Sequence, residues 1–114
     1  MTILEIYEKV NLVVPIEQRR FFNYFEDTVN ELQSLYRDFV FIKGAEYTPP
    51  TSLSDNEEEN VVLPLYHNSI VDNILFLANA GETYKSEFIR KSNDAYLKYW
   101  NDNAKGRRKR RMRW

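Results

Sequence analysis

Hydrophobic residues recur every three or four positions in four stretches of the chain, a pattern typical of amphipathic helices. The first stretch, residues 2–11, opens with Thr2 and Glu5 at the spacing of a capping box. The second, residues 15–37, begins at Pro15, which suits the first turn of a helix. Its apolar stripe consists of Phe22, Phe25, Val29, Leu32 and Tyr36. We therefore expect two helices in the N-terminal third.

Two further helical patterns lie in the C-terminal half. The one that follows Pro64 is apolar around most of its circumference, so we expect it at the centre of the core. Gly81 comes after it at the position of a left-handed C-terminal cap. The last pattern extends from about Thr83 to Ala104, and Gly106 is predicted to end it. Its apolar side is formed by Tyr84, Phe88, Ala95, Tyr96, Tyr99 and Trp100.

The period changes between residues 38 and 62. Residues 39–42 are β-branched and aromatic, and Gly44 follows them, which predicts a small hairpin. Pro49 and Pro50 end regular structure, and the acidic stretch 51–60 is expected to be a solvated loop. The predicted fold class is mainly α: a small four-helix bundle with a short β-hairpin/loop insertion between the second and third helices. We expect a helical domain at 1–105 and an extended basic arm at 106–114.

Charge is distributed unevenly along the 114 residues. The net charge is −1, but seven of the 16 basic residues and none of the 17 acidic ones lie in residues 105–114. Residues 1–104 therefore carry nine basic and 17 acidic side chains, a net charge of −8. An acidic body with a basic tail indicates an interaction arm. The predicted partner-binding residues are Arg107, Arg108, Lys109, Arg110, Arg111, Met112, Arg113 and Trp114.

The sequence offers little catalytic chemistry. It has no cysteine, so a disulfide framework, a Cys-ligated zinc site and a thiol nucleophile are excluded. The single histidine, His67, has no carboxylate at i+4, and we expect it to be a structural or interface residue. The three glycines are isolated and form no phosphate loop. The acidic run at 55–59 is typical of a hydrated surface rather than a cation site. We expect no enzymatic activity, no cofactor and no metal.

One series of motifs runs through the C-terminal half: Leu63-Pro64-Leu65-Tyr66-His67-Asn68, Val71-Asp72-Asn73-Ile74-Leu75, Tyr84, Phe88, Ala95-Tyr96, Tyr99-Trp100-Asn101 and Gly106-Arg107-Arg108. With these motifs the chain resembles the head–tail connector, or adaptor, proteins of tailed bacteriophages. The resemblance covers about residues 61–114, whereas the two N-terminal helices agree only in order and length.

This resemblance implies a structural virion protein of the head–tail junction, assembled in the host cytoplasm. Its copies would form a ring, usually of twelve, beneath the portal, with genomic DNA passing through the lumen. The implied partners are the portal protein, neighbouring copies and a tail or nozzle/stopper protein. A membrane is not among the implied partners. The C-terminal segment commonly embraces the portal in this family, a role that would fall to residues 106–114 here.

Two alternatives follow from the basic tail. A nucleic-acid-binding packaging or regulatory protein would use the tail alone, because no recognition-helix motif stands out. The other alternative is a toxin-antitoxin or regulatory subunit whose basic arm folds on an acidic partner. Base stacking by Phe21, Phe22, Tyr24 and Phe25 is disfavoured, since helical spacing is more typical of a core or subunit interface.

Overall fold

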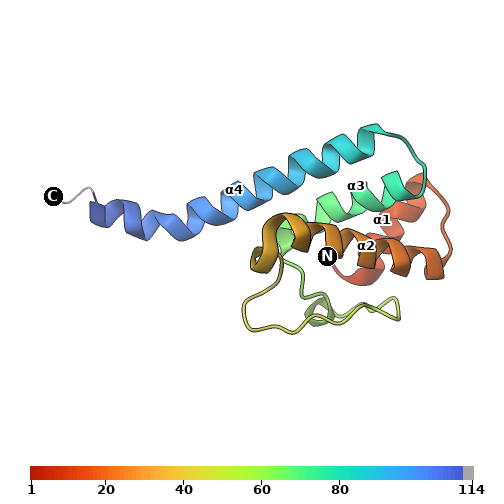
Figure 1. The fold of residues 1–114 in the computed structure, drawn as a ribbon. Coiled ribbons are helices and arrows are strands. Elements are labelled where there is room, and N and C mark those ends of the chain that lie inside the picture. The colour runs from red at the N-terminus through yellow and green to blue at the C-terminus, as the bar shows by residue number, and fades with distance from the viewer. Residues whose placement is uncertain (112–114) are drawn as a thin grey trace.

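The computed structural model describes the backbone of residues 1–111 and the side chains of residues 1–102 other than Asp38. The chain is mainly helical, as predicted. The described residues form four α-helices: α1 (Ile3–Val13), α2 (Gln18–Tyr36), α3 (His67–Leu77) and α4 (Thr83–Arg111). Three short 3-10 turns lie between α2 and α3: η1 (Arg37–Val40), η2 (Glu57–Glu59) and η3 (Pro64–Tyr66). Helices α1, α2 and α3 gather into a body along which α4 runs before it projects beyond it (Figure 1). No helix among the described residues is both long enough and apolar enough to cross a membrane.

Helix α1 begins as the sequence predicts. The Thr2 hydroxyl accepts a hydrogen bond from the Glu5 amide at 3.1 Å, and the Glu5 carboxylate accepts one from the Thr2 amide at 3.2 Å. This capping box satisfies two amides that have no partner inside the helix. Ile3, Ile6 and Val10 then point into the core.

Helix α2 starts three residues later than expected, so Pro15 lies in the connection between the first two helices. The apolar stripe is confirmed except at its start, where Phe21 is fully buried and Phe22 only half-buried. Phe21 packs edge-on against Tyr7 at 5.1 Å between ring centroids. The rings of Phe21 and Phe25 therefore belong to the core and are not available to stack on bases.

Helix α3 is the centre of the core, as predicted. It packs against α1, α2 and α4, and eight of its 11 residues are buried. Several of these are polar, and Asn73 and Asp72 have partners on the neighbouring helices. Asn73 donates to the Thr28 hydroxyl at 2.8 Å, and Lys85 donates to Asn73 at 3.1 Å.

The predicted hairpin at residues 39–47 is wrong. No strand occurs in residues 1–111, and Phe41 forms only an isolated antiparallel bridge with Val62. The Leu63 amide donates to the Val40 carbonyl at 2.8 Å, so this segment pairs with residues 61–63 instead of folding back locally. The physical reason is burial: the long-range pairing places Val40 and Val62 fully inside the core. Gly44 does adopt the positive φ that a turn requires, at +83°.

Both predicted glycine stops were also misplaced. The left-handed residue after α3 is Asn79, with φ +64°, and not Gly81. Helix α4 does not end at Gly106 but continues to Arg111, so residues 106–111 are helical rather than extended. A glycine weakens a helix by about 1 kcal/mol relative to alanine but keeps its amide donor. Cations near the helix C-terminus also interact favourably with the helix dipole, which offsets their mutual repulsion.

Candidate functional site

The body supports α4 over only part of its length. On α4, Phe88 and Ala95 are buried, and the last ring contacts with the body are made by Tyr99 and Trp100. Phe39 of η1 meets these rings at centroid distances of 5.6 Å and 4.8 Å. We call Phe39, Tyr96, Tyr99 and Trp100 the aromatic cluster. It lies where α4 leaves the body.

Polar contacts hold the supported part of α4 at three further points. Near its start, the Lys85 ammonium lies 2.5 Å from the Glu31 carboxylate and over the face of Phe88. One turn and a half further on, Lys91 pairs with the mostly buried Asp72 at 2.7 Å. Tyr36 of α2 donates a hydrogen bond to the Asn93 side chain. These contacts fix the direction of α4, and therefore the direction in which its C-terminal end projects.

Residues 101–111 of α4, the projecting segment, carry five of the eight predicted partner-binding residues. Their backbone is helical, and six of the seven positions from Lys105 to Arg111 are cationic. The sequence therefore places a dense run of cations on the last turns of this helix. The other three predicted residues, Met112, Arg113 and Trp114, lie outside the described residues.

Exposed apolar side chains adjoin the projecting segment. Leu97 is 60% exposed and Trp100 is 40% exposed, three residues apart on α4. Residues at this spacing share one side of a helix. An apolar strip therefore leads from the body into the basic end of α4, a combination typical of a surface that binds a partner.

A second charged surface lies in the acidic loop, residues 44–60. Its five carboxylates, Glu46, Asp55, Glu57, Glu58 and Glu59, are all exposed. The sequence contains no lysine or arginine from Gly44 to Tyr84. Within the described part of the chain, no ion pair involves any of the five. The loop therefore presents an uncompensated negative field.

The acidic loop is nonetheless anchored to the body. Its Ser54 carbonyl accepts a hydrogen bond from the Leu4 amide at 3.1 Å, and Asn56 caps η2 by accepting from the Glu58 amide at 3.0 Å. Tyr47 stacks on Phe41 at 5.0 Å. Burial, followed by the negative charge of Glu26, raises the pKa of Tyr47 to about 12. These contacts anchor the backbone of the acidic loop to the body.

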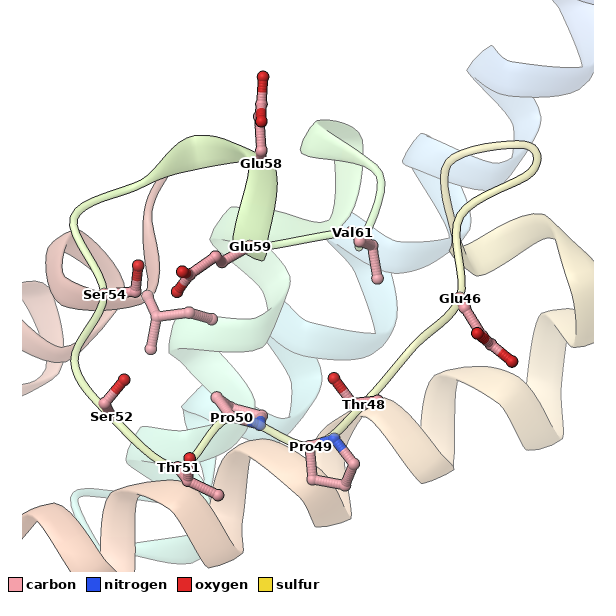
Figure 2. Close-up of a pocket in the computed structure, with 11 residues that line it drawn as sticks. Glu46, Thr48, Pro49, Pro50, Thr51, Ser52, Ser54, Glu58, Glu59 and Val61 are labelled. Atoms are coloured by element: carbon pink, nitrogen blue, oxygen red, sulfur yellow. The ribbon is translucent and has the colours of Figure 1, made fainter.

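The acidic loop and Ile3 of α1 line a cavity of about 270 Å³ that is open to solvent on one side (Figure 2). Figure 2 shows the Glu59 side chain turned toward Ser54 inside the loop, whereas Glu58 points away from the cavity. Pro49 and Pro50 form the opposite side of the cavity. No group of three or more potential metal ligands occurs among the described residues. The outward carboxylates face solvent and are available to a cationic partner.

His67 takes part in a buried polar contact at the start of α3. Its Nε2 lies 2.8 Å from the Val62 carbonyl, and its Nδ1 lies 2.8 Å from the amino group of Met1. Asn60 is 3.3 Å from Nε2 and also donates to the Met1 carbonyl. Burial lowers the pKa of His67. The imidazole is thus occupied in joining the start of α1 to the segment that precedes α3.

The aromatic cluster is the feature that the sequence reading missed. Phe39 was expected in a hairpin, and Trp100 was expected on the buried side of its helix. No local signal connects two residues 61 positions apart, since their meeting depends on how α4 crosses η1.

Comparison with family models, with curated proteins and with solved structures finds no match to this chain.

Proposed function

We propose that this protein is a structural head-to-tail adaptor of a tailed bacteriophage, which forms a ring, dodecameric in the family it resembles, beneath the portal. The observation that carries the proposal is the projecting segment: a helix that leaves a negatively charged body and bears six cations in its last seven described positions. In the proposed assembly this end of α4, together with Met112, Arg113 and Trp114, grips the portal and neighbouring copies.

The fixed direction of α4 suits such a joint. Because ion pairs and ring contacts hold α4 on the body, each copy presents its basic end in the same orientation. A ring multiplies modest single contacts, since every further contact becomes intramolecular once the first has formed. About twelve such ends would make a joint that is effectively permanent.

The charge of the body suits a DNA channel. Residues 1–104 carry a net charge of −8, and like charges repel. Carboxylates lining a ring lumen would keep passing genomic DNA from adhering to the wall. The opposite face of the ring would receive a tail or nozzle/stopper protein at the head–tail junction of the virion.

The test is to mix the full chain with the portal protein of the same phage and to image the mixture by negative-stain electron microscopy. We expect the portal to gain an extra ring of density, and its absence would contradict the proposal. A chain that ends after Lys105 should lose docking and keep its folded helical body. A charge-matched control with Lys at Arg107, Arg108, Arg110, Arg111 and Arg113 should dock more strongly than one with Gln there.

The second candidate function is nucleic-acid binding through the same cations. It is favoured by the density of positive charge, which releases counterions from phosphates on binding. It predicts DNA affinity that falls with salt at a log–log slope of about −0.9 for each phosphate neutralised. Negligible DNA binding near physiological salt would exclude it, whereas portal docking at the same salt would favour the adaptor.

A further inference from the structure

We propose that α4, from Leu97 to Arg111, docks on the acidic loop of a second copy of this chain. This inference rests on the ring of the proposed function and specifies the contact that joins its neighbours. The contact is head-to-tail, because two different surfaces of the chain meet, and head-to-tail contacts generate rings when the rotation between copies closes.

Helix α4 projects from the body and carries exposed apolar side chains at the point where it leaves. Leu97 and Trp100 are exposed on the helix just before the projecting segment, and the backbone of α4 extends beyond the other helices (Figure 1). A helical end that is apolar at its base and basic along its last turns is complementary to a partner with a negative surface.

The acidic loop and the end of α4 are complementary in charge. The acidic loop offers five exposed carboxylates without an ion pair in the described part of the chain. The projecting segment offers Lys105, Arg107, Arg108, Lys109, Arg110 and Arg111. The two surfaces are of similar charge and opposite sign, which steers their encounter and fixes their orientation.

The basic end of α4 does not reach the acidic loop of its own copy. Eleven helical residues beyond Trp100 extend about 16 Å away from the body, and the three residues that follow reach about 10 Å more. Gly44 and Ala45, at the start of the acidic loop, line a pocket with Tyr99 of α4. In Figure 1 the part of the loop around η2 (Glu57–Glu59) lies on the other side of the body from α4, and the far end of α4 points away from the body. Its basic end therefore cannot return to its own loop, so the loop that it meets belongs to another copy.

This arrangement leaves a role for the portal. When residues 105–111 cross the neighbour's acidic loop, Met112, Arg113 and Trp114 follow directly and remain free to contact the portal. The C-terminal end of one copy would then join a neighbouring copy and also contact the portal. The acidic loop, which the resemblance does not explain, acquires the function of receiving that end.

Charge-swap complementation tests this contact on the full chain. The loop variant carries Glu57→Lys, Glu58→Lys and Glu59→Lys, and the tail variant carries Arg107→Glu, Arg108→Glu, Arg110→Glu and Arg111→Glu. We expect the unmodified chain to self-associate at low ionic strength in sedimentation velocity, and added salt to weaken this association. Each variant alone should associate at least about tenfold more weakly, because like charges then face each other.

The decisive sample is an equimolar mixture of the two variants. The reversed, positive loop of one variant then meets the reversed, negative tail of the other. The normal loop of the tail variant likewise meets the normal tail of the loop variant, so association should return. A misfolded variant cannot produce this recovery. A mixture that stays monomeric, or a loop variant that associates like the unmodified chain, would overturn the inference. Portal docking by the unmodified chain is scored separately, so the adaptor proposal survives or fails on its own result.

Discussion

The ring centroids of Phe39 and Trp100 lie 4.8 Å apart, although the two residues are 61 positions apart in the sequence. Phe39 belongs to the turn that ends α2, and Trp100 is the last residue of α4 with a ring contact to the body. This pair therefore sets the point at which α4 becomes free of the body and the direction in which its basic end projects.

Removing the Phe39 ring should loosen that point. In a Trp114→Phe background, where Trp100 is the remaining tryptophan, Phe39→Ala should shift the fluorescence emission to longer wavelength, because the indole gains contact with water. Phe39→Leu, which retains apolar bulk, serves as the control and should shift it less. An unchanged emission spectrum in the alanine variant would contradict the contact.

The core position of α3 can be tested by a cavity-forming substitution. Ile70 is fully buried, whereas Leu12 is 85% exposed. Ile70→Ala should lower the free energy of unfolding by about 2–5 kcal/mol, and Leu12→Ala should change it by less than about 0.5 kcal/mol. Urea unfolding followed by circular dichroism measures both. Equal effects in the two variants would be inconsistent with this packing.

The buried His67 predicts a loss of stability in mild acid. Its pKa is lowered by burial, so the unfolded chain takes up a proton near pH 6.5 that the folded chain resists. The free energy of unfolding should therefore fall as the pH drops from about 7 to 5. Carboxyl groups ordinarily titrate below this pH range. The pKa of Glu87 is lowered further by its hydrogen bond to Arg90, so Glu87 does not contribute to the change between pH 7 and pH 5.

The His67→Gln variant provides the control, because it keeps a polar side chain that does not titrate. Its stability should change less between pH 7 and pH 5 than that of the unmodified chain, as measured by urea unfolding at each pH. If both proteins lose the same stability over this range, another group is responsible.

The helical course of α4 through Gly106 predicts opposite effects for two substitutions there. Gly106→Ala should stabilise the last turns by up to about 1 kcal/mol. Gly106→Pro should break the helix before the cationic residues, because proline removes an amide donor and clashes with the preceding turn. We expect helical circular dichroism and low-salt self-association to be retained in the alanine variant and reduced in the proline variant. Full association by the proline variant would show that the contact does not need a helix.

Much of the fold could be predicted from the sequence, because its causes are local. The capping box at Thr2, the stripes of α1 and α2 and the apolar circumference of α3 are visible as spacings along the chain. The uneven charge that motivates the functional proposal is likewise a property of the sequence alone. Short-range geometry and hydrophobic periodicity are sufficient for these features.

Only the tertiary structure decided the remaining features, because they depend on partners that are distant in the sequence. Residues 40–42 look like half of a hairpin, yet pairing with 61–63 buries Val40 and Val62 and is preferred. The cationic residues after Gly106 look like an extended arm, yet the preceding helix offers them a template and a favourable dipole. The sequence determined which surfaces carry charge, and the packing of α4 over Phe39 determined that the basic surface projects away from the acidic one.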